Sequence, residues 1–237
     1  MKSRRPGRGQ TFSGTLRSAW EHRGCDGGRY EEERAVAKVT CNLSISADGY
    51  SAGLNQSEER PFGDDGGDGW GSKLHAWFVE TPEENRAEIE QMTAAKAFIM
   101  GRNMFGPVRG EWDRQWNGWW GDDPPYHAPV FVLTHHPRDP QPMDGGTTYY
   151  FVTDGIESAL AQAREAAGDG DVAIMGGATT INQYLAAGLL DELRLDIVPF
   201  TLGAGTRLFD GVPPLKLEQV KSRAARLVTH VIYRVLS

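Results

Sequence analysis

The chain has 237 residues, of which 39% are hydrophobic and 24% charged, and its formal net charge is −7. These values fit one globular domain, because α/β domains commonly reach about 200 residues or slightly more. The negative charge argues against non-specific nucleic-acid binding, which draws its affinity from neutralised phosphates. No apolar run approaches the roughly 18 to 20 residues of a membrane helix, so we expect no membrane contact and a cytoplasmic protein.

Residues 1–36 differ in composition from the rest of the chain. They contain eight Lys and Arg against five Asp and Glu, with scattered glycines and no apolar period. Such a composition is typical of disorder, so we predict a loosely attached N-terminal extension followed by one folded domain over residues 37–237. A basic arm can also tether a nucleic acid, but glutamates interrupt this one, and we favour a simple appendage.

No metal site is expected. Cys25 and Cys41 are the two cysteines, and they form no C-x-x-C pair, so neither a disulfide framework nor a zinc site is predicted. The stretch 64–69 (DDGGDG) is superficially like a calcium loop. However, its third position is Gly66 and its twelfth is His75, where a calcium loop needs oxygen ligands.

The first half of the folded domain begins with residues 38–46, which alternate apolar and polar side chains as a half-buried strand does. Asp48-Gly49 then turns the chain. Further on we expect a short helix over 73–79, an acidic amphipathic helix over 83–96 that starts at Thr81-Pro82, and a buried strand over 97–100. A long loop with four tryptophans follows over 106–128.

The second half continues the alternation of strands and helices. Strands are predicted over 129–133, 149–153, 171–175, 192–198 and 226–236, and helices over 155–167 and 179–187. Strands that alternate with helices through short turns predict an α/β sheet that is parallel in most of its middle.

Two glycine turns at predicted strand ends are candidates for binding an anionic group. Free N–H groups and the positive end of the helix dipole favour a phosphate where a strand ends and a helix begins. Glycines allow a close backbone approach, and threonines add hydroxyl groups. The first turn comprises Gly176, Gly177, Ala178, Thr179 and Thr180; the second comprises Gly101, Arg102, Asn103 and Met104, with a planar guanidinium that suits a phosphate.

A third strand end supplies Thr134, His135 and His136. These side chains are able to contact an adenosine ribose and its 2′-phosphate. For His135, an ordinary polar exit from a strand explains the sequence equally well.

The order of these motifs resembles that of dihydrofolate reductase: Asp48-Gly49, Ile99-Met-Gly-Arg102, Leu133-Thr134 and Ile174-Met-Gly-Gly177. The later segments Gly188-Leu-Leu-Asp-Glu-Leu193 and Val198-Pro-Phe-Thr-Leu-Gly-Ala-Gly-Thr-Arg-Leu-Phe209 are similar to the reductase domain of riboflavin biosynthesis, the C-terminal half of a bifunctional deaminase-reductase. The resemblance covers about residues 37–236.

The resemblance implies a dihydrofolate-reductase-like α/β fold, with a mostly parallel central sheet flanked by helices and an antiparallel C-terminal edge. It also implies that NADPH lies across the carboxyl edge of the sheet. Residues 101–104 and 176–180 would contact its phosphates, and Thr134 would contact it too. Arg102 and His136 would favour NADPH over NADH. In dihydrofolate reductase a cis peptide joins the glycine pair, so the Gly176-Gly177 bond is expected to be cis.

The predicted substrate site departs from both relatives. Dihydrofolate reductases carry an acid on the first helix, where this chain offers His75, Glu80, Glu83 and Glu84 without a clear match. Riboflavin-pathway reductases commonly have a glutamate before the glycine turn, where this chain has Met175. Neither their substrate arginines nor the H-x-E and P-C-x-x-C deaminase signature has a clear counterpart. The substrate acid stays unassigned, and substrate contacts are predicted from Trp70, Met175 and Phe200.

Hydride transfer needs orientation and a partly dry pocket more than a nucleophile, so no catalytic triad is expected. Asp48 is the candidate catalytic residue beside the nicotinamide, although Asp-Gly is also an ordinary turn. The tryptophans of the long loop form either a lid or pocket wall, which we favour, or core or dimer contacts. They are Trp112, Trp116, Trp119 and Trp120.

The sequence thus predicts an NADPH-dependent reductase of a small heterocyclic or unsaturated substrate, resembling riboflavin-pathway 5-amino-6-(5-phosphoribosylamino)uracil reductase and dihydrofolate reductase. We expect a homodimer with a small-molecule substrate and no nucleic-acid partner. The alternative is a non-catalytic ligand-binding or dimerisation module on the same fold, which a sealed pocket at the nicotinamide position would favour.

Overall fold

The computed structural model describes residues 37–67, 73–107 and 110–236. The predicted extension over 1–36 and Trp70 lie outside these residues. None of the described helices has the length and hydropathy that crossing a membrane requires. In chain order the elements are β1 (Val39–Ser46), β2 (Tyr50–Ala52), the 3₁₀ helix η1 (Lys73–His75), α1 (Ala76–Glu80), α2 (Arg86–Met92), β3 (Ala97–Gly101), α3 (Arg102–Phe105), β4 (Pro129–Leu133), β5 (Gln141–Pro142), the 3₁₀ helix η2 (Asp144–Gly146), β6 (Thr148–Val152), α4 (Ile156–Ala167), β7 (Val172–Ile174), α5 (Ala178–Ala186), β8 (Glu192–Val198), β9 (Thr206–Arg207), β10 (Lys216–Ala224) and β11 (Thr229–Leu236).

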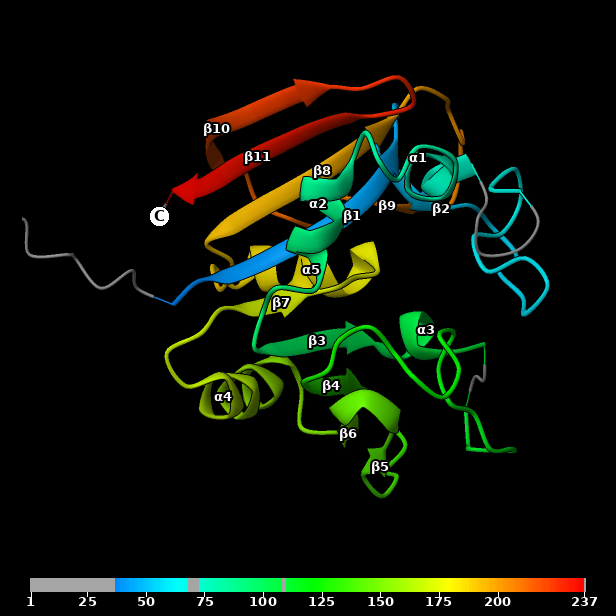
Figure 1. Ribbon diagram of the computed structural model, residues 1–237, viewed down its shortest axis with the longest axis vertical. Helices are drawn as coiled ribbons and strands as arrows, with labels where there is room; N and C mark the ends of the chain where they lie inside the picture. Colours follow the sequence, from blue (N-terminus) through cyan, green and yellow to red (C-terminus); the bar gives the residue numbers. More distant parts are fainter. Residues whose placement is uncertain (1–36, 68–72, 108–109, 237) are drawn as a thin grey trace, which may run out of the picture. The chain divides into compact units, whose positions relative to one another are not determined.

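Nine strands of the described residues form one sheet in the order β10-β11-β8-β1-β7-β3-β4-β6-β5 (Figure 1). The run from β8 to β6 is parallel throughout. At the edges, β11 is antiparallel to β8, β10 to β11, and β5 to β6. Strands β2 and β9 form a separate antiparallel pair. The predicted α/β class, with its parallel middle and antiparallel C-terminal edge, is therefore confirmed.

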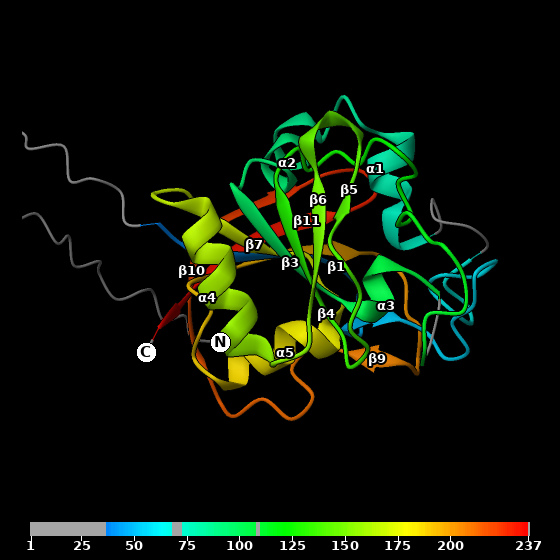
Figure 2. The ribbon, with the colours of Figure 1, turned by 90° about the horizontal axis from the view of Figure 1, so that it is seen from below.

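Helices cover both faces of this sheet, with α1 and α2 on one side and α4 and α5 on the other (Figure 2). Strand β1 shows how its sequence supports two different layers, because successive side chains of a strand point to opposite faces. Cys41, Leu43 and Ile45 are buried in the main core with residues of α4 and α5. On the opposite face, the Ser44 hydroxyl accepts a hydrogen bond at 3.2 Å from Nε1 of Trp77 in α1.

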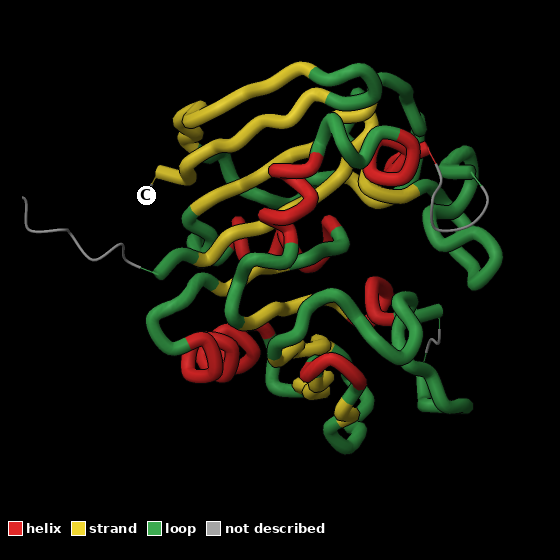
Figure 3. The backbone as a smooth tube through the Cα atoms, viewed as in Figure 1, coloured by secondary structure: helices red, strands yellow, loops and turns green. Residues whose placement is uncertain are grey.

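Two predicted elements differ from the structure by three or more residues at one end or both, and the others by at most one residue at either end. The helix expected over 83–96 is only α2, because the Asn85 amide donates to the carbonyls of Trp77 and Thr81 and so holds the preceding turn outside the helix. The strand expected over 226–236 begins at Thr229, after a turn in which the Ala225 N–H donates to the Val228 carbonyl. Figure 3 shows this turn between the two C-terminal strands.

Strand β10 was not predicted from the sequence. Its side chains are mostly exposed, so it lacks the alternation of apolar and polar residues that marks a half-buried strand. It pairs with β11 through backbone hydrogen bonds at the edge of the sheet. The parallel strands, in contrast, all end at one edge, and ligands of open α/β sheets bind outside the carboxyl ends of such strands.

Candidate active site

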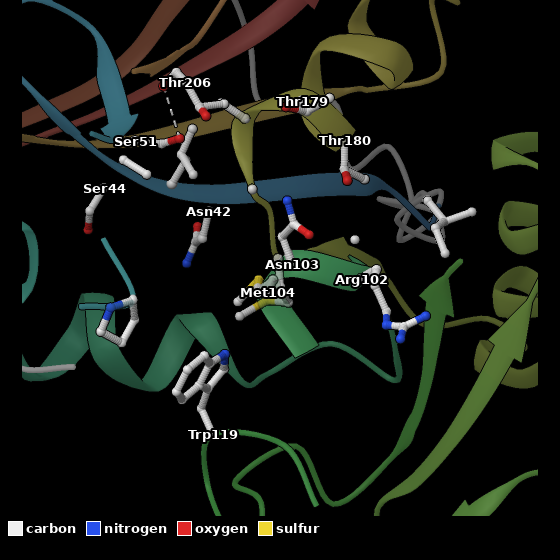
Figure 4. Close-up of a pocket in the computed structure, with 18 of the residues that line it drawn as sticks. Asn42, Ser44, Ser51, Arg102, Asn103, Met104, Trp119, Thr179, Thr180 and Thr206 are labelled. Atoms are coloured by element: carbon white, nitrogen blue, oxygen red, sulfur yellow. Dashed lines mark hydrogen bonds between the residues drawn. The ribbon is translucent and has the colours of Figure 1, made fainter. Parts of the chain in front are cut away.

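A cavity of about 750 Å³ lies at this edge of the sheet, within the range of about 300 to 1,000 Å³ that is usual for small-molecule sites. We call its two parts the glycine end and the β8 end. The glycine end is lined by the turns after β3, β4 and β7, and the β8 end by β1, β8, η1, α1 and the tryptophan loop. Figure 4 shows Arg102 and Thr180 toward one side of the cavity and Asn42 and Ser44 toward the other, with Asn103 and Met104 between them.

The glycine end joins the two predicted glycine turns. The Gly101 N–H donates to the Gly176 carbonyl at 2.9 Å. Gly176 has a φ of +106°, a backbone conformation that glycine adopts readily and other residues rarely do. The peptide bond between Gly176 and Gly177 is cis, as predicted. Helix α5 begins directly after Gly177, so the N–H groups of Ala178 and Thr179, which have no acceptor within the helix, lie beside the cavity.

Gly101 and Gly177, the members of the two predicted turns that line the cavity, are needed for different reasons. A Cβ atom at position 101 would lie 2.4 Å from Oγ1 of Thr180, so the packing of the protein itself excludes a side chain there. A Cβ atom at position 177 would meet no protein atom within 4 Å. The open space beside Gly177 therefore lets a ligand approach the backbone at the start of α5.

Arg102 is held in a defined orientation at the glycine end. Its guanidinium donates to Oγ1 of Thr134 at 2.8 Å and to the Gly110 carbonyl at 3.0 Å. It also stacks on the Trp112 ring at 3.3 Å from the ring centroid, a cation–π contact. His136 lines the same part of the cavity, and its backbone N–H donates to Oγ1 of Thr134. The fold thus brings Arg102, from the turn after β3, to Thr134 of the turn after β4, on which His136 also lies.

Most residues predicted for the cofactor line this cavity. Gly176 is the exception, and it acts through its carbonyl bond to the neighbouring turn. The lining members of the prediction are Gly101, Arg102, Asn103, Met104, Thr134, His136, Gly177, Ala178, Thr179 and Thr180.

The residues predicted to bind the substrate lie in different places. Met175 lines the cavity, whereas Phe200 is not among the lining residues. Phe200 instead packs against the cluster around Leu74 and Trp77, with the Lys73 ammonium 5.8 Å from its ring centroid. Phe200 follows the end of β8, where its carbonyl accepts a hydrogen bond from the Ala47 N–H at 2.8 Å. Trp70 lies outside the described residues.

Asp48, the predicted catalytic residue, does not line the cavity. Its carboxylate accepts hydrogen bonds from the Ser46 hydroxyl at 2.5 Å and from the N–H groups of Leu202 and Gly203 at 3.0 and 2.8 Å. The hydrogen bond from Ser46, followed by those backbone N–H groups, lowers the pKa of Asp48 to about 2. The geometry corrects the prediction: Asp48 fastens the loop after β8 to the end of β1.

The β8 end has a polar floor made by side chains of two adjacent strands. Asn42 and Ser44 of β1 and Asp196 of β8 line the cavity, and Ser44 lies beside Asp196 in the parallel register. Asp196 is hydrogen-bonded to Nδ1 of His230 on β11 at 2.6 Å. Burial raises the pKa of Asp196, although this hydrogen bond opposes the shift.

The first helical segment contributes a histidine to the cavity. His75 lines the β8 end, and burial lowers its pKa to about 4, so its ring is neutral at physiological pH. Glu80, Glu83 and Glu84 are absent from the lining residues that the structure describes. Across the described part of the chain, no cluster of three or more His, Cys, Asp and Glu side chains could hold a metal ion.

The four tryptophans of the long loop divide between the two alternatives. Trp119 and Trp120 line the cavity as a wall. Trp112 and Trp116 pack against the core cluster around Phe105 and Tyr149. Trp120 belongs to both groups, because it also packs against this cluster, so the loop is fixed to the sheet by the same part that forms the cavity wall.

Sequence reasoning missed the polar floor, although a signal was present. In the predicted strand 192–198, Leu193, Leu195 and Ile197 alternate with Glu192, Arg194 and Asp196. Strands in the middle of a parallel sheet are usually apolar on both faces. A polar face on such a strand therefore indicates either a functional cavity or a polar layer.

Known proteins match this chain in sequence and fold. The sequence model described as the RibD C-terminal domain matches residues 37–231. The Bacillus subtilis (strain 168) protein YyaP, described as uncharacterized, is 33% identical over 106 residues, which are 44% of this chain and 52% of YyaP.

Solved structures also match. A putative riboflavin biosynthesis protein from Shewanella sp. PV-4 aligns with a TM-score of 0.57 and 24% identity, over 84% of this chain and 99% of its own. Enterococcus faecalis dihydrofolate reductase, in complex with NADP(H) and RAB-propyl, aligns with a TM-score of 0.51 and 15% identity, over 84% of this chain and 97% of its own.

The fold and the cavity at its carboxyl edge define a dihydrofolate-reductase-like α/β domain, as the sequence predicted. More specifically, the chain belongs to the RibD C-terminal domain family. Family and fold together indicate a reductase-type domain.

Proposed function

We propose that this protein is an NADPH-dependent reductase of a small heterocyclic or otherwise unsaturated substrate. The observation that carries the proposal is one continuous cavity that links the two glycine turns to a polar floor of β1 and β8. A reductase of this class needs both parts side by side, because cofactor and substrate must meet in a fixed orientation.

The residues of the glycine end fit a dinucleotide phosphate. Gly177 leaves open space beside the N-terminus of α5, a place where backbone N–H groups and the helix dipole favour an anion. Arg102 adds a guanidinium oriented by Thr134 and Trp112. When bound, the reduced nicotinamide supplies the hydride of the reaction. The chain's own contribution is to bind, to orient and, through the aromatic wall of Trp119 and Trp120, to exclude water.

The substrate end supports a reductase more strongly than a binding module. A module without chemistry was expected to have a sealed pocket, but the cavity extends past Met104 and Met175 to Asn42 and Asp196. The Enterococcus faecalis neighbour binds NADP(H), which agrees with an NADPH-dependent activity. Met175, in place of the glutamate of riboflavin-pathway reductases, favours a substrate other than theirs. The homodimer and the cytoplasmic location stay predictions.

Titration of NADPH against intrinsic tryptophan fluorescence tests the cofactor, with NADH as the control. Trp119 and Trp120 line the cavity, so binding should quench the emission. Absence of any change at millimolar NADPH would remove the proposed function.

The variant Arg102→Ala should raise the Kd for NADPH by roughly 10-fold or more, because a charged hydrogen bond contributes about 1.5 to 3 kcal/mol, and leave the Kd for NADH nearly unchanged. Arg138→Ala is the matched control. Cζ of Arg138 also lies over the Trp112 ring, 4.9 Å from its centroid, but Arg138 is not among the cavity-lining residues. Equal losses for both cofactors would show that Arg102 does not read the 2′-phosphate.

The reaction is tested by substrate-dependent oxidation of NADPH across pterins, pyrimidines and unsaturated carbonyl compounds. A compound that accelerates oxidation identifies the substrate class. Binding of NADPH without turnover of any compound would favour the ligand-binding module instead.

A further inference from the structure

The pair of Asp196 and His230 is held in one arrangement by Asn85. The Nδ2 amino group of Asn85 donates to the Trp77 carbonyl and to both oxygens of Thr81, at 3.2, 2.9 and 3.0 Å. The amide orientation is therefore fixed, and its Oδ1 oxygen must face the other way. That oxygen lies 3.0 Å from Nε2 of His230.

This orientation determines where the protons of His230 are. Oδ1 of Asn85 is an acceptor only, and it also accepts from the Arg223 guanidinium at 2.8 Å. Nε2 of His230 must consequently carry a proton and donate it. The other ring nitrogen, Nδ1, lies 2.6 Å from the Asp196 carboxyl, a distance that requires one proton between the two atoms. The pair thus holds one shared proton in addition to the Nε2 proton.

Asp196 has access to two cavities. Its side chain lines the large cavity, and it also lines a second cavity of about 50 Å³ together with Asn42 and His230. A space of that size exceeds the roughly 10 to 15 Å³ that a water molecule needs, and its polar wall offers partners for water. The pair is therefore connected on one side to the substrate end and on the other to a small polar cavity.

The charged groups around the pair come from α2, β8 and β10. Glu88 of α2 receives two hydrogen bonds from Arg223 of β10, at 2.9 and 2.8 Å, so these charges compensate each other. Helix α1 contributes the uncharged ring of Trp77, 5.1 Å from that of His230, and β1 contributes the uncharged side chains of Asn42 and Ser44. The charged residues that line the second cavity are Glu88, Arg194, Asp196, Lys221 and Arg223, with His230 beside them.

Other titratable residues that line the large cavity are poorer proton donors. His75 is neutral, with a pKa that burial lowers to about 4, and burial raises the pKa of Tyr126 to about 12. Glu90 is exposed on α2, and His135 and His136 lie at the glycine end. Asp196 is the buried acid of the β8 end.

We propose that Asp196 is the catalytic proton donor of this protein and that His230, fixed by Asn85, is its positioning residue. The inference rests on the proposed reductase function. In the step, the substrate's double bond gains a hydride at one atom, and its electron pair forms a new bond to a proton at the adjacent atom. The O–H bond of Asp196 breaks to supply that proton. The pair is left as a carboxylate beside neutral His230, and one proton from bulk solvent returns to it through the second cavity.

Nitrogen-15 NMR of histidine-labelled full-length protein tests the shared proton without any turnover. The His230 signals are identified by their loss in His230→Gln. We expect Nε2 to stay protonated and the pair to lose its one shared proton in a single step as the pH rises. A pair with no proton between Nδ1 of His230 and the Asp196 carboxyl at neutral pH overturns the proposal.

Turnover with a compound found in the NADPH oxidation screen tests the transfer. Asp196→Asn should lower kcat by about 10² to 10⁴-fold, the usual contribution of a general acid, and leave the Kd for NADPH unchanged. The wild-type rate should fall as the pH rises through the ionisation that NMR detects, whereas the rate of the variant should not depend on this ionisation. Glu192→Gln is the matched control, because it removes a carboxylate from the same face of β8, outside the cavity.

Loss of one partner of a buried pair can destabilise a protein, so a second variant is needed. The double variant Asp196→Asn/His230→Gln replaces the pair with two amides that can hydrogen-bond to each other, and it should fold and show the same loss of kcat. A purely structural pair would give kcat values near those of Glu192→Gln, with an unchanged pH profile, and would overturn the proposal. If no compound is reduced, the proposed function fails separately, and the NMR titration still decides whether the pair holds the proton.

Discussion

The two ends of the cavity are built from different parts of the chain. The glycine end is mainly backbone: two turns joined by one N–H to carbonyl bond, a helix N-terminus, and open space beside Gly177. The β8 end is mainly side chains: Asn42 and Ser44 of β1 and Asp196 of β8, on strands whose other face is apolar core.

Because of this difference, the two ends respond differently to amino-acid substitution. Backbone N–H groups are present whatever the side chains are, so a glycine turn at a strand end recognises a phosphate across many sequences. A side-chain floor changes with each substitution. The family match covers residues 37–231 and so includes both ends, while Met175 and the first helix are the places where the sequence departs from the expected substrate residues.

The largest expected effect is at the support of the β8 end. Trp77 is fully buried, donates to Ser44 and contacts the His230 ring edge to face. Trp77→Ala should lower the free energy of unfolding by about 3 to 5 kcal/mol, measured by urea denaturation, because it leaves a large cavity. Trp77→Phe should lose less. If Trp77→Ala also abolished NADPH binding in conditions where it is folded, the two ends would not be separate.

Substitutions at Gly101 and Gly177 distinguish the effect of packing on stability from the effect on NADPH binding at the glycine end. Gly101→Ala should cost about 1 to 3 kcal/mol of stability, because its Cβ would collide with Thr180, and it should weaken NADPH binding. Gly177→Ala should change stability by no more than about 0.5 kcal/mol, because its Cβ has room. The methyl group would nevertheless occupy the approach to α5, so the Kd for NADPH should rise. Equal destabilisation by both variants would contradict the open space at Gly177.

Asp48 belongs to neither end, and its effect should depend on pH. Its folded pKa of about 2 is below the usual 3.8, so its carboxylate stabilises the fold above the unfolded pKa, and this contribution is lost as the pH falls toward 2. Asp48→Asn should lower the urea midpoint at pH 6, and the difference from wild type should disappear near pH 2. The Kd for NADPH should not change; a large change would restore Asp48 to the active site.

The smallest expected effect on stability is at Asn42. Its Oδ1 oxygen is buried without a hydrogen-bond partner among the described residues. Asn42→Leu should therefore be nearly neutral or slightly stabilising, since no hydrogen bond is lost. Asn182→Leu is the matched control: Asn182 donates to the Arg207 carbonyl and accepts from the Phe209 N–H, and its loss should cost about 1 to 3 kcal/mol. If Asn42→Leu cost as much, Oδ1 would have a partner in solution. Asn42→Leu should weaken substrate binding only.

Individual elements show how far sequence reasoning reached. The strands over 129–133 and 192–198 were predicted with the bounds that the structure has, because each is a continuous or alternating apolar run. The helix over 83–96 was too long, because the Asn85 side chain binds the end of α1 instead of continuing the helix. Asp48 lies in the predicted turn, but it does not have the predicted role, because its carboxylate accepts hydrogen bonds from a loop more than 150 residues later in the sequence.

The sequence by itself determined the order of strands and helices, the α/β class and the two glycine turns, because periodicity and glycine conformation are local properties of the chain. Only the tertiary structure decided the polar floor. Asp196 and His230 are 34 residues apart in the sequence, and His230 and Asn85 are 145 apart. These side chains form hydrogen bonds because β8 lies between β1 and β11 and beneath α2. Which polar side chains share a cavity depends on the order of strands in the sheet, and no local pattern records that order.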